Sequence, residues 1–250
     1  MTNPTSAASN GDASTTTGAG TTDAMHDPAS RHLRDLVYET LANEGRAPSM
    51  GELATKTEST PAEVRSRMQA LADEHALVLN DEGDAVRMAH PFTAAPMAFV
   101  LTPVDGFDDR RWWGGCAWDS FGISAALGLD VRVETACPHC AAVISFVTGP
   151  ETAPPEDLAV RFPRPAAEWW EDVVATCTKI RMFCSREHAE SWTAQHAPGE
   201  GYIAPATSVW SLAQPWYGDR IRADFEPHTS EHNQALLEER GFTGDFWKLP

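Results

Sequence analysis

The spacing of apolar residues changes from helical to strand-like near position 75, and this change restricts the chain to folds that mix helices with strands. Before it, apolar residues recur every three or four positions in three segments, which begin near Arg31, Ser49 and Thr60. Residues 75–88 then alternate around a turn at 81–83, which indicates two strands. Three helices followed by a β-hairpin predict a winged-helix-like domain over residues 29–90.

From Pro91 onward the pattern indicates short strands, at 98–101, 131–134 and 143–148, with a helix from Cys116 to about Leu127 between the first two. Residues 173–183 form an apolar stretch typical of a strand. The predicted fold class is therefore α+β, with a winged-helix-like domain followed by a mixed α/β domain. We predict a disordered polar tail over 1–28, a second domain over 91–212 and an aromatic, acidic C-terminal extension over 213–250 that packs on it.

The charge of the chain makes several classes of partner unlikely. Nineteen basic against 36 acidic side chains give a net charge of −17, which repels phosphate, so nucleic acid is not an expected partner. No apolar run approaches the roughly 20 residues of a membrane span, and the N-terminus has no signal-peptide pattern. We expect a cytoplasmic protein that does not bind membranes. The scarcity of lysine fits a high-salt cytosol or an ordinary acidic protein.

All five cysteines lie between positions 116 and 184, and without an export signal we expect reduced thiols. Cys116 follows two glycines at the predicted start of a helix, where free N–H groups lower the pKa of a thiol. Asp119 lies three residues later, on the same helical face, and Trp112, Trp113 and Trp118 are expected to desolvate its carboxyl group. This segment alone leaves open an inert buried cysteine beside a surface aspartate.

Two further cysteine motifs have more than one interpretation. Cys177 in its apolar stretch is either a core residue or a ligand, and Cys184, before another predicted helix, competes with it. The sequence Cys137-Pro138-His139-Cys140 is half of a tetrahedral zinc site, which needs four nitrogen or sulfur ligands. Cys137 and Cys140 are therefore candidates for a secondary metal site, which could be completed from Cys177, Cys184, His139 and His188.

The stretch from Asp108 to Asp119 (DDRRWWGGCAWD) resembles the catalytic signature of organomercurial (alkylmercury) lyases. The segment around Cys177, continuing to Trp192, resembles the part of that family that carries its second catalytic cysteine. An N-terminal winged-helix-like domain is also a family feature, and the similarity runs from about residue 30 to about residue 212. Thr178 departs from the family, which often has a further cysteine there, and Cys140 and Cys184 have no counterpart.

The resemblance implies an enzyme that breaks carbon–mercury bonds by protonolysis, on a domain with antiparallel strands. It assigns Cys116, Asp119 and Cys177 as catalytic residues and mercury ligands, and Cys137 as a structural cysteine. Mercury prefers thiolate sulfur, and the aspartate is implied to pass a cysteine proton to the carbon. No organic cofactor is expected, Hg(II) is the bound product, and small thiols or a mercuric reductase would accept it. Zinc remains a candidate at the secondary site.

Two alternatives explain the same residues differently. A metal-responsive winged-helix regulator would explain the N-terminal domain and the thiols, but not the aspartate three residues after Cys116, and the negative charge disfavours DNA binding. A non-catalytic scaffold stabilised by zinc would use Cys137, Cys140 and two further ligands.

Overall fold

The computed structural model describes residues 24–104 and 109–250, and it has an α+β fold with N-terminal helices and antiparallel sheets. The helices are α1 (Pro28–Glu44), α2 (Met50–Lys56), α3 (Pro61–Asp73), α4 (Ala117–Leu127), α5 (Val173–Lys179), α6 (Arg186–His196), α7 (Ala206–Tyr217) and α8 (Ser230–Glu239), with short 3-10 helices η1 (Ala166–Glu171) and η2 (Asp245–Trp247). The strands are β1 (Val78–Leu79), β2 (Val86–Ala89), β3 (Phe92–Thr93), β4 (Phe99–Pro103), β5 (Trp112–Gly114), β6 (Val131–Ala136), β7 (Val143–Thr148), β8 (Ala159–Phe162), β9 (Arg181–Phe183) and β10 (Tyr202–Pro205).

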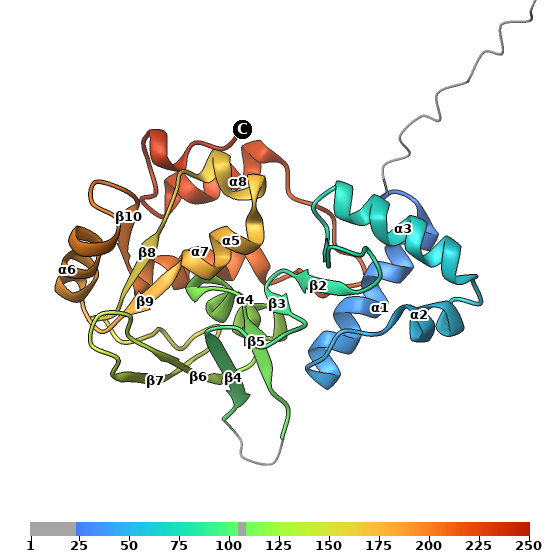
Figure 1. Ribbon diagram of the computed structural model, residues 1–250, viewed down its shortest axis with the longest axis horizontal. Helices are drawn as coiled ribbons and strands as arrows, with labels where there is room; N and C mark the ends of the chain where they lie inside the picture. Colours follow the sequence, from blue (N-terminus) through green and yellow to red (C-terminus); the bar gives the residue numbers. More distant parts are fainter. Residues whose placement is uncertain (1–23, 105–108) are drawn as a thin grey trace, which may run out of the picture.

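The three predicted N-terminal helices are present and carry strong capping groups, although α1 begins before Arg31 and α2 continues to Lys56. Ser49 and Glu52 form a capping box at the start of α2, and Thr60 with Glu63 forms another at α3. Gly45 closes α1 in the left-handed conformation, with φ of 68°. Figure 1 shows these helices gathered at one end of the molecule, with α6 at the opposite end. Most of the predicted tail, residues 1–23, lies outside the described residues.

The hairpin that follows the helices is the edge of the main sheet rather than a separate wing. The seven strands of this sheet are ordered β1-β2-β3-β5-β4-β6-β7, and each described pair in it is antiparallel. Ala89 of β2 pairs with Phe92 of β3, so the sheet runs across the predicted boundary at position 90. A second sheet has the order β10-β8-β9.

Helix α4 lies at the centre of the molecule, and residues 117–126 of it are all buried. A helix that is apolar on all sides is typically buried in the core of a protein. Helix α7 packs closely against it at Gly122, where an added Cβ would lie 2.5 Å from Cδ2 of Tyr217. The packing of α7 on α4 therefore requires a glycine at this position, and it fixes where the tyrosine ring lies.

The prediction of a strand over residues 173–183 is wrong for its first part, since Val173–Lys179 is helix α5 and only Arg181–Phe183 forms a strand. The carboxylate of Asp172 accepts a hydrogen bond from the backbone N–H of Ala175 at 2.9 Å. This cap starts a helix despite the β-branched residues, whose strand preference is weak compared with tertiary context.

The aromatic C-terminal segment packs on the preceding domain, as predicted. Trp247 is fully buried, and its ring centroid lies 4.8 Å from that of Phe162 and 6.0 Å from that of Trp169. Helix α7 begins before the predicted extension and runs through its boundary at residue 213. Among the described residues, each helix is too short or too polar to cross a lipid bilayer.

Candidate active site

A cavity of about 100 Å³ lies between helices α4, α5 and α7 and the N-terminal helices. Cys116, Asp119 and Cys177 all line it, although the last is 61 positions after Cys116 in the sequence. Tyr38 and His75 line it from the N-terminal side, so both halves of the molecule build its wall.

Cys116 is the N-cap residue of α4, as predicted, and is 2% exposed. Its Sγ accepts a hydrogen bond from the backbone N–H of Asp119 at 3.3 Å. Gly115 leaves room for this approach, because a Cβ there would lie 2.5 Å from Met88 Cε and 2.8 Å from Asp119 Oδ2.

The expected lowering of the Cys116 pKa is wrong. Burial raises the pKa of this thiol well above its ordinary value, and the hydrogen bond with Cys177 and the charge of Asp119 act in the same direction. The backbone N–H of Asp119 opposes them but is outweighed. Cys116 is therefore a neutral thiol in the substrate-free site.

Cys177 lies on α5, is 6% exposed and lines the same cavity as Cys116. The competing cysteine, Cys184, lies elsewhere, with its sulfur 3.8 Å from that of Cys140. The backbone N–H of Ala117 donates to the carbonyl of Ile180 at 3.1 Å, which joins the start of α4 to the end of α5. This bond brings the two thiol-bearing segments together.

Asp119 is 1% exposed, and its two carboxyl oxygens have different surroundings. Oδ1 lies 3.4 Å from the hydroxyl of Tyr217, which donates to it, and 3.4 Å from Nδ1 of His90. Oδ2 is buried without a hydrogen-bond partner among the described residues. One oxygen is therefore held by two side chains, while the other makes no hydrogen bond to the described residues.

The aromatic wall around Asp119 differs from the one expected. Trp118 lines the cavity, but the indole of Trp112 points away and donates to the carbonyls of Leu41 and Ala42, both at 3.1 Å. Other tryptophans take its place, with the ring of Trp118 lying 5.0 Å from Trp216 and 5.3 Å from Trp169. The site is still enclosed by large rings, which exclude water from the carboxyl group.

Comparison with known proteins identifies the family to which this chain belongs. Residues 92–218, just over half of the chain, match the family model of MerB, described as alkylmercury lyase. The chain belongs to the MerB alkylmercury lyase family. The matched region contains Cys116, Asp119 and Cys177, together with Tyr217.

The fold agrees with this membership of the alkylmercury lyase family. A crystal structure of the mercury-bound form of MerB2 is similar to this chain, with a TM-score of 0.60 and 19% sequence identity. The similarity covers 79% of this chain and 95% of that one. At this identity the comparison shows a shared fold, which extends beyond the region matched by the family model.

Sequence reasoning missed two residues of this candidate site, His90 and Tyr217. Burial by itself lowers the pKa of His90, but the charges of Asp119 and Cys177 and the hydrogen bond to Asp119 outweigh it and raise the pKa to about 9. Burial, followed by the charge of Asp119, raises the pKa of Tyr217 well above its ordinary value. Both residues lie on segments distant from Asp119 in the sequence, so no local pattern indicated them.

A second group of ligand-type side chains lies outside the cavity. Ligand atoms of Cys137, Cys140, Cys184 and His188 are all within 4.8 Å of one another. Of the residues considered for completing this cluster, Cys184 and His188 join it, whereas Cys177 belongs to the cavity. Burial tends to raise the pKa of Cys137, but backbone N–H donors and His188 lower it to about 6.

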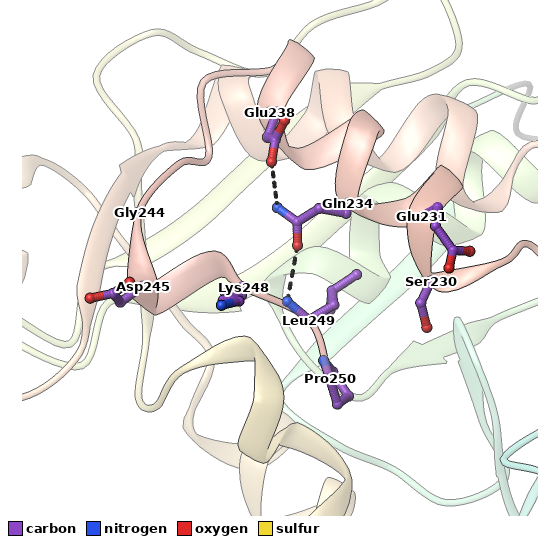
Figure 2. Close-up of a pocket in the computed structure, with 9 residues that line it drawn as sticks. All are labelled: Ser230, Glu231, Gln234, Glu238, Gly244, Asp245, Lys248, Leu249 and Pro250. Atoms are coloured by element: carbon purple, nitrogen blue, oxygen red, sulfur yellow. Dashed lines mark hydrogen bonds between the residues drawn. The ribbon is translucent and has the colours of Figure 1, made fainter.

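A larger hollow near the C-terminus, of about 440 Å³, is lined by residues of α8 and η2 and by the last residues of the chain (Figure 2). The side-chain amide of Gln234 donates to Glu238 at 3.0 Å and accepts from the backbone N–H of Leu249 at 3.0 Å. These bonds attach the end of the chain to α8. The lining includes neither cysteine nor histidine, so this hollow offers no ligand for a soft metal.

Proposed function

We propose that this chain cleaves the carbon–mercury bond of organomercurials by protonolysis, with Cys116 and Cys177 as mercury ligands and Asp119 as the proton donor to carbon. The observation that carries the proposal is the convergence of these three side chains in one buried cavity. Membership of the alkylmercury lyase family supports the same chemistry.

Binding begins with the exchange of ligands on mercury. Hg(II) is soft and favours sulfur, so the thiol of Cys116 replaces the leaving ligand X of R–Hg–X, and its proton departs with X as HX. The raised pKa of Cys116 means that mercury must displace this proton, because the free thiol does not ionise on its own.

The second sulfur then activates the bond to carbon. As Cys177 joins the mercury, its proton passes to Asp119, since a carboxylate oxygen of Asp119 lies within 4.8 Å of the Cys177 sulfur. Two thiolates increase the electron density on mercury, and the Hg–C electron pair becomes more available to a proton.

Protonation of carbon completes the reaction. The unpartnered Oδ2 of Asp119 is the oxygen that we assign to carry the proton, because Oδ1 is occupied by His90 and Tyr217. The Hg–C pair forms the new C–H bond, R–H leaves, and Hg(II) stays on the two sulfurs. Two thiol protons are consumed, one in HX and one in R–H. Small thiols or a mercuric reductase would then remove the metal.

We assign the N-terminal winged-helix-like domain a structural role in this site rather than a role in DNA recognition. It supplies Tyr38 and His75 to the cavity wall, and β2 is held within the main sheet. The exposed face of α3 carries Glu63 beside Arg65, a mixture that gives no basic surface for phosphate.

The test is release of benzene from phenylmercury in the presence of excess thiol, measured by gas chromatography. Wild-type protein should release benzene, whereas Cys177→Ser should lose at least ~100-fold in rate because one mercury ligand is gone. The matched control is Thr178→Ser, which changes the next residue of α5 without removing a side chain that lines the cavity and should retain the wild-type rate. Full activity of the Cys177 variant, or equal losses in both variants, would contradict the assignment.

A further inference from the structure

Four side chains that the proposed lyase reaction does not use form a compact cluster on the other side of β9 from α5. Cys137 and Cys140 lie in the turn between β6 and β7, while Cys184 and His188 lie at the junction of β9 with α6. Their ligand atoms all lie within 4.8 Å of one another. The CxxC half-site recognised in the sequence thus acquires two further ligands, from a segment more than 40 residues away.

The spacing of these atoms fits a tetrahedral ion. Sγ of Cys140 lies 3.8 Å from Sγ of Cys184, and Sγ of Cys137 lies 3.7 Å from Nδ1 of His188. Around zinc, bonds of about 2.3 Å to sulfur and about 2.0 Å to nitrogen place two sulfurs about 3.8 Å apart and a sulfur and a nitrogen about 3.6 Å apart. Both separations in the cluster match these edges of a tetrahedron. In a disulfide the two sulfurs lie about 2.0 Å apart. The Cys140 and Cys184 sulfurs are 3.8 Å apart, so they are not bonded to each other.

Backbone hydrogen bonds shape the turn that carries the first two proposed ligands. The turn is closed by two backbone bonds of 2.9 Å, from the N–H of Cys137 to Ala142 and from the N–H of Ala141 to Cys137. Ala141 adopts a φ of 59°, a conformation unusual for a residue with a side chain. The turn therefore holds both of its cysteines within reach of Cys184 and His188.

We propose that Cys137, Cys140, Cys184 and His188 bind one structural zinc ion. Three thiolates and one imidazole form a closed set of four ligands, which is typical of structural rather than catalytic zinc. The ion would join the β6–β7 turn of the seven-stranded sheet to the end of β9 in the three-stranded sheet. Because β9 directly follows α5, the ion also fixes the segment that carries Cys177. The zinc site is independent of the proposed carbon–mercury chemistry.

The neighbouring His139 provides a matched control for His188. Its ring lies 4.7 Å from that of His188, it is exposed, and it does not belong to the group of four ligand atoms. A substitution at His139 therefore changes the same turn without removing a proposed ligand.

The experiment is metal analysis of the reduced full-length chain, purified after expression with zinc and measured by plasma mass spectrometry. Wild-type protein should contain about one zinc per chain, and Cys140→Ser and His188→Ala should each fall several-fold below that after dialysis. His139→Ala, Cys116→Ser and Cys177→Ser should keep the ion. Cobalt(II) added to metal-free wild-type protein should give the intense visible absorption of a tetrahedral site with thiolate ligands.

Three results would overturn the proposal. The first is wild-type protein that contains no zinc and gives no tetrahedral cobalt spectrum. The second is zinc retained by Cys140→Ser but lost from Cys116→Ser or Cys177→Ser, which would place the ion in the cavity. The third is a Cys140–Cys184 disulfide found by mass spectrometry in the freshly purified chain. If the ligand variants fail to fold, X-ray absorption at the zinc edge of wild-type protein decides, with three sulfurs and one nitrogen expected.

Discussion

At the scale of single residues, the two carboxyl oxygens of Asp119 have different hydrogen-bond partners. His90 and Tyr217 both contact Oδ1, whereas Oδ2 has no hydrogen-bond partner in the described part of the chain. A buried polar atom without a partner is costly, and such atoms are found preferentially at functional sites. We assign His90 as a positioning residue, because its Nδ1 lies 3.4 Å from Oδ1 of the carboxylate.

Substitution of His90 should change how stability depends on pH. The folded-state pKa of about 9 lies above the ordinary value of 6.5, so the charged imidazole stabilises the fold fully below pH 6.5. That contribution is lost as the pH rises through 9 and is on the order of 3 kcal/mol. Thermal unfolding of His90→Gln between pH 6 and 10 should therefore depend less on pH than that of wild-type protein. Parallel curves for the two proteins would contradict the assigned contact with Asp119.

The part of the site whose residues are close together in the sequence could be predicted from the sequence, whereas contacts between distant segments could not. Cys116 and Asp119 share a helical turn, so their proximity follows from local geometry. Cys177 and Cys184 could not be separated by local pattern alone, because the choice depends on which end of β9 faces α4. The resemblance to the lyase family assigned Cys177, and the structure places it beside Cys116. The low thiol pKa expected at a helix start was wrong because burial outweighs the N–H groups.

At the scale of elements, the site depends on the contact between α4 and α7. Helix α4 carries Cys116 and Asp119, and α7 carries Tyr217. Gly122 permits the close approach of the two helices. The N-terminal helices were predictable from their caps, whereas α5 was not, since its β-branched sequence favours a strand and the Asp172 cap outweighs that preference.

A methyl group at position 122 should separate these two helices. Its Cβ would lie 2.5 Å from Tyr217 Cδ2 and 2.8 Å from Pro91 Cβ, so Gly122→Ala should destabilise the fold by about 1–3 kcal/mol. Benzene release should also fall, because the Tyr217 hydroxyl is displaced from Asp119.

The matched control is Gly51→Ala in α2, where the nearest atom to an added Cβ is 3.9 Å away. There the change should leave the protein as stable or stabilise it by up to about 1 kcal/mol, because alanine favours a helix. Chemical denaturation measures both variants, and similar effects from the two would contradict the close packing of α4 on α7.

At the scale of the whole molecule, the net charge of −17 affects stability and choice of partner. Acidic residues outnumber basic ones almost two to one, and many of the ion pairs in the structure are exposed, such as Arg46 with Glu52. Exposed pairs contribute little, so repulsion among the excess carboxylates is only partly offset.

Salt should therefore stabilise this chain. Raising potassium chloride from 0.1 M to 1 M shortens the screening length from about 10 Å to about 3 Å and weakens repulsion between carboxylates. The midpoint of thermal unfolding should rise by several degrees, as measured by circular dichroism. A midpoint that falls, or does not change, would show that the acidic surface does not limit stability at low salt.

The measurement that tests the central claim most directly is a single turnover of phenylmercury in deuterated water, with wild-type protein and Asp119→Asn compared. Wild-type protein should release benzene with one deuterium, since the carbon receives its hydrogen from exchangeable groups of the site, and retain about one equivalent of Hg(II). Asp119→Asn should still bind phenylmercury through Cys116, but release benzene at least ~100-fold more slowly. Release by Asp119→Asn at the wild-type rate would contradict the assignment of this carboxyl group as the proton donor.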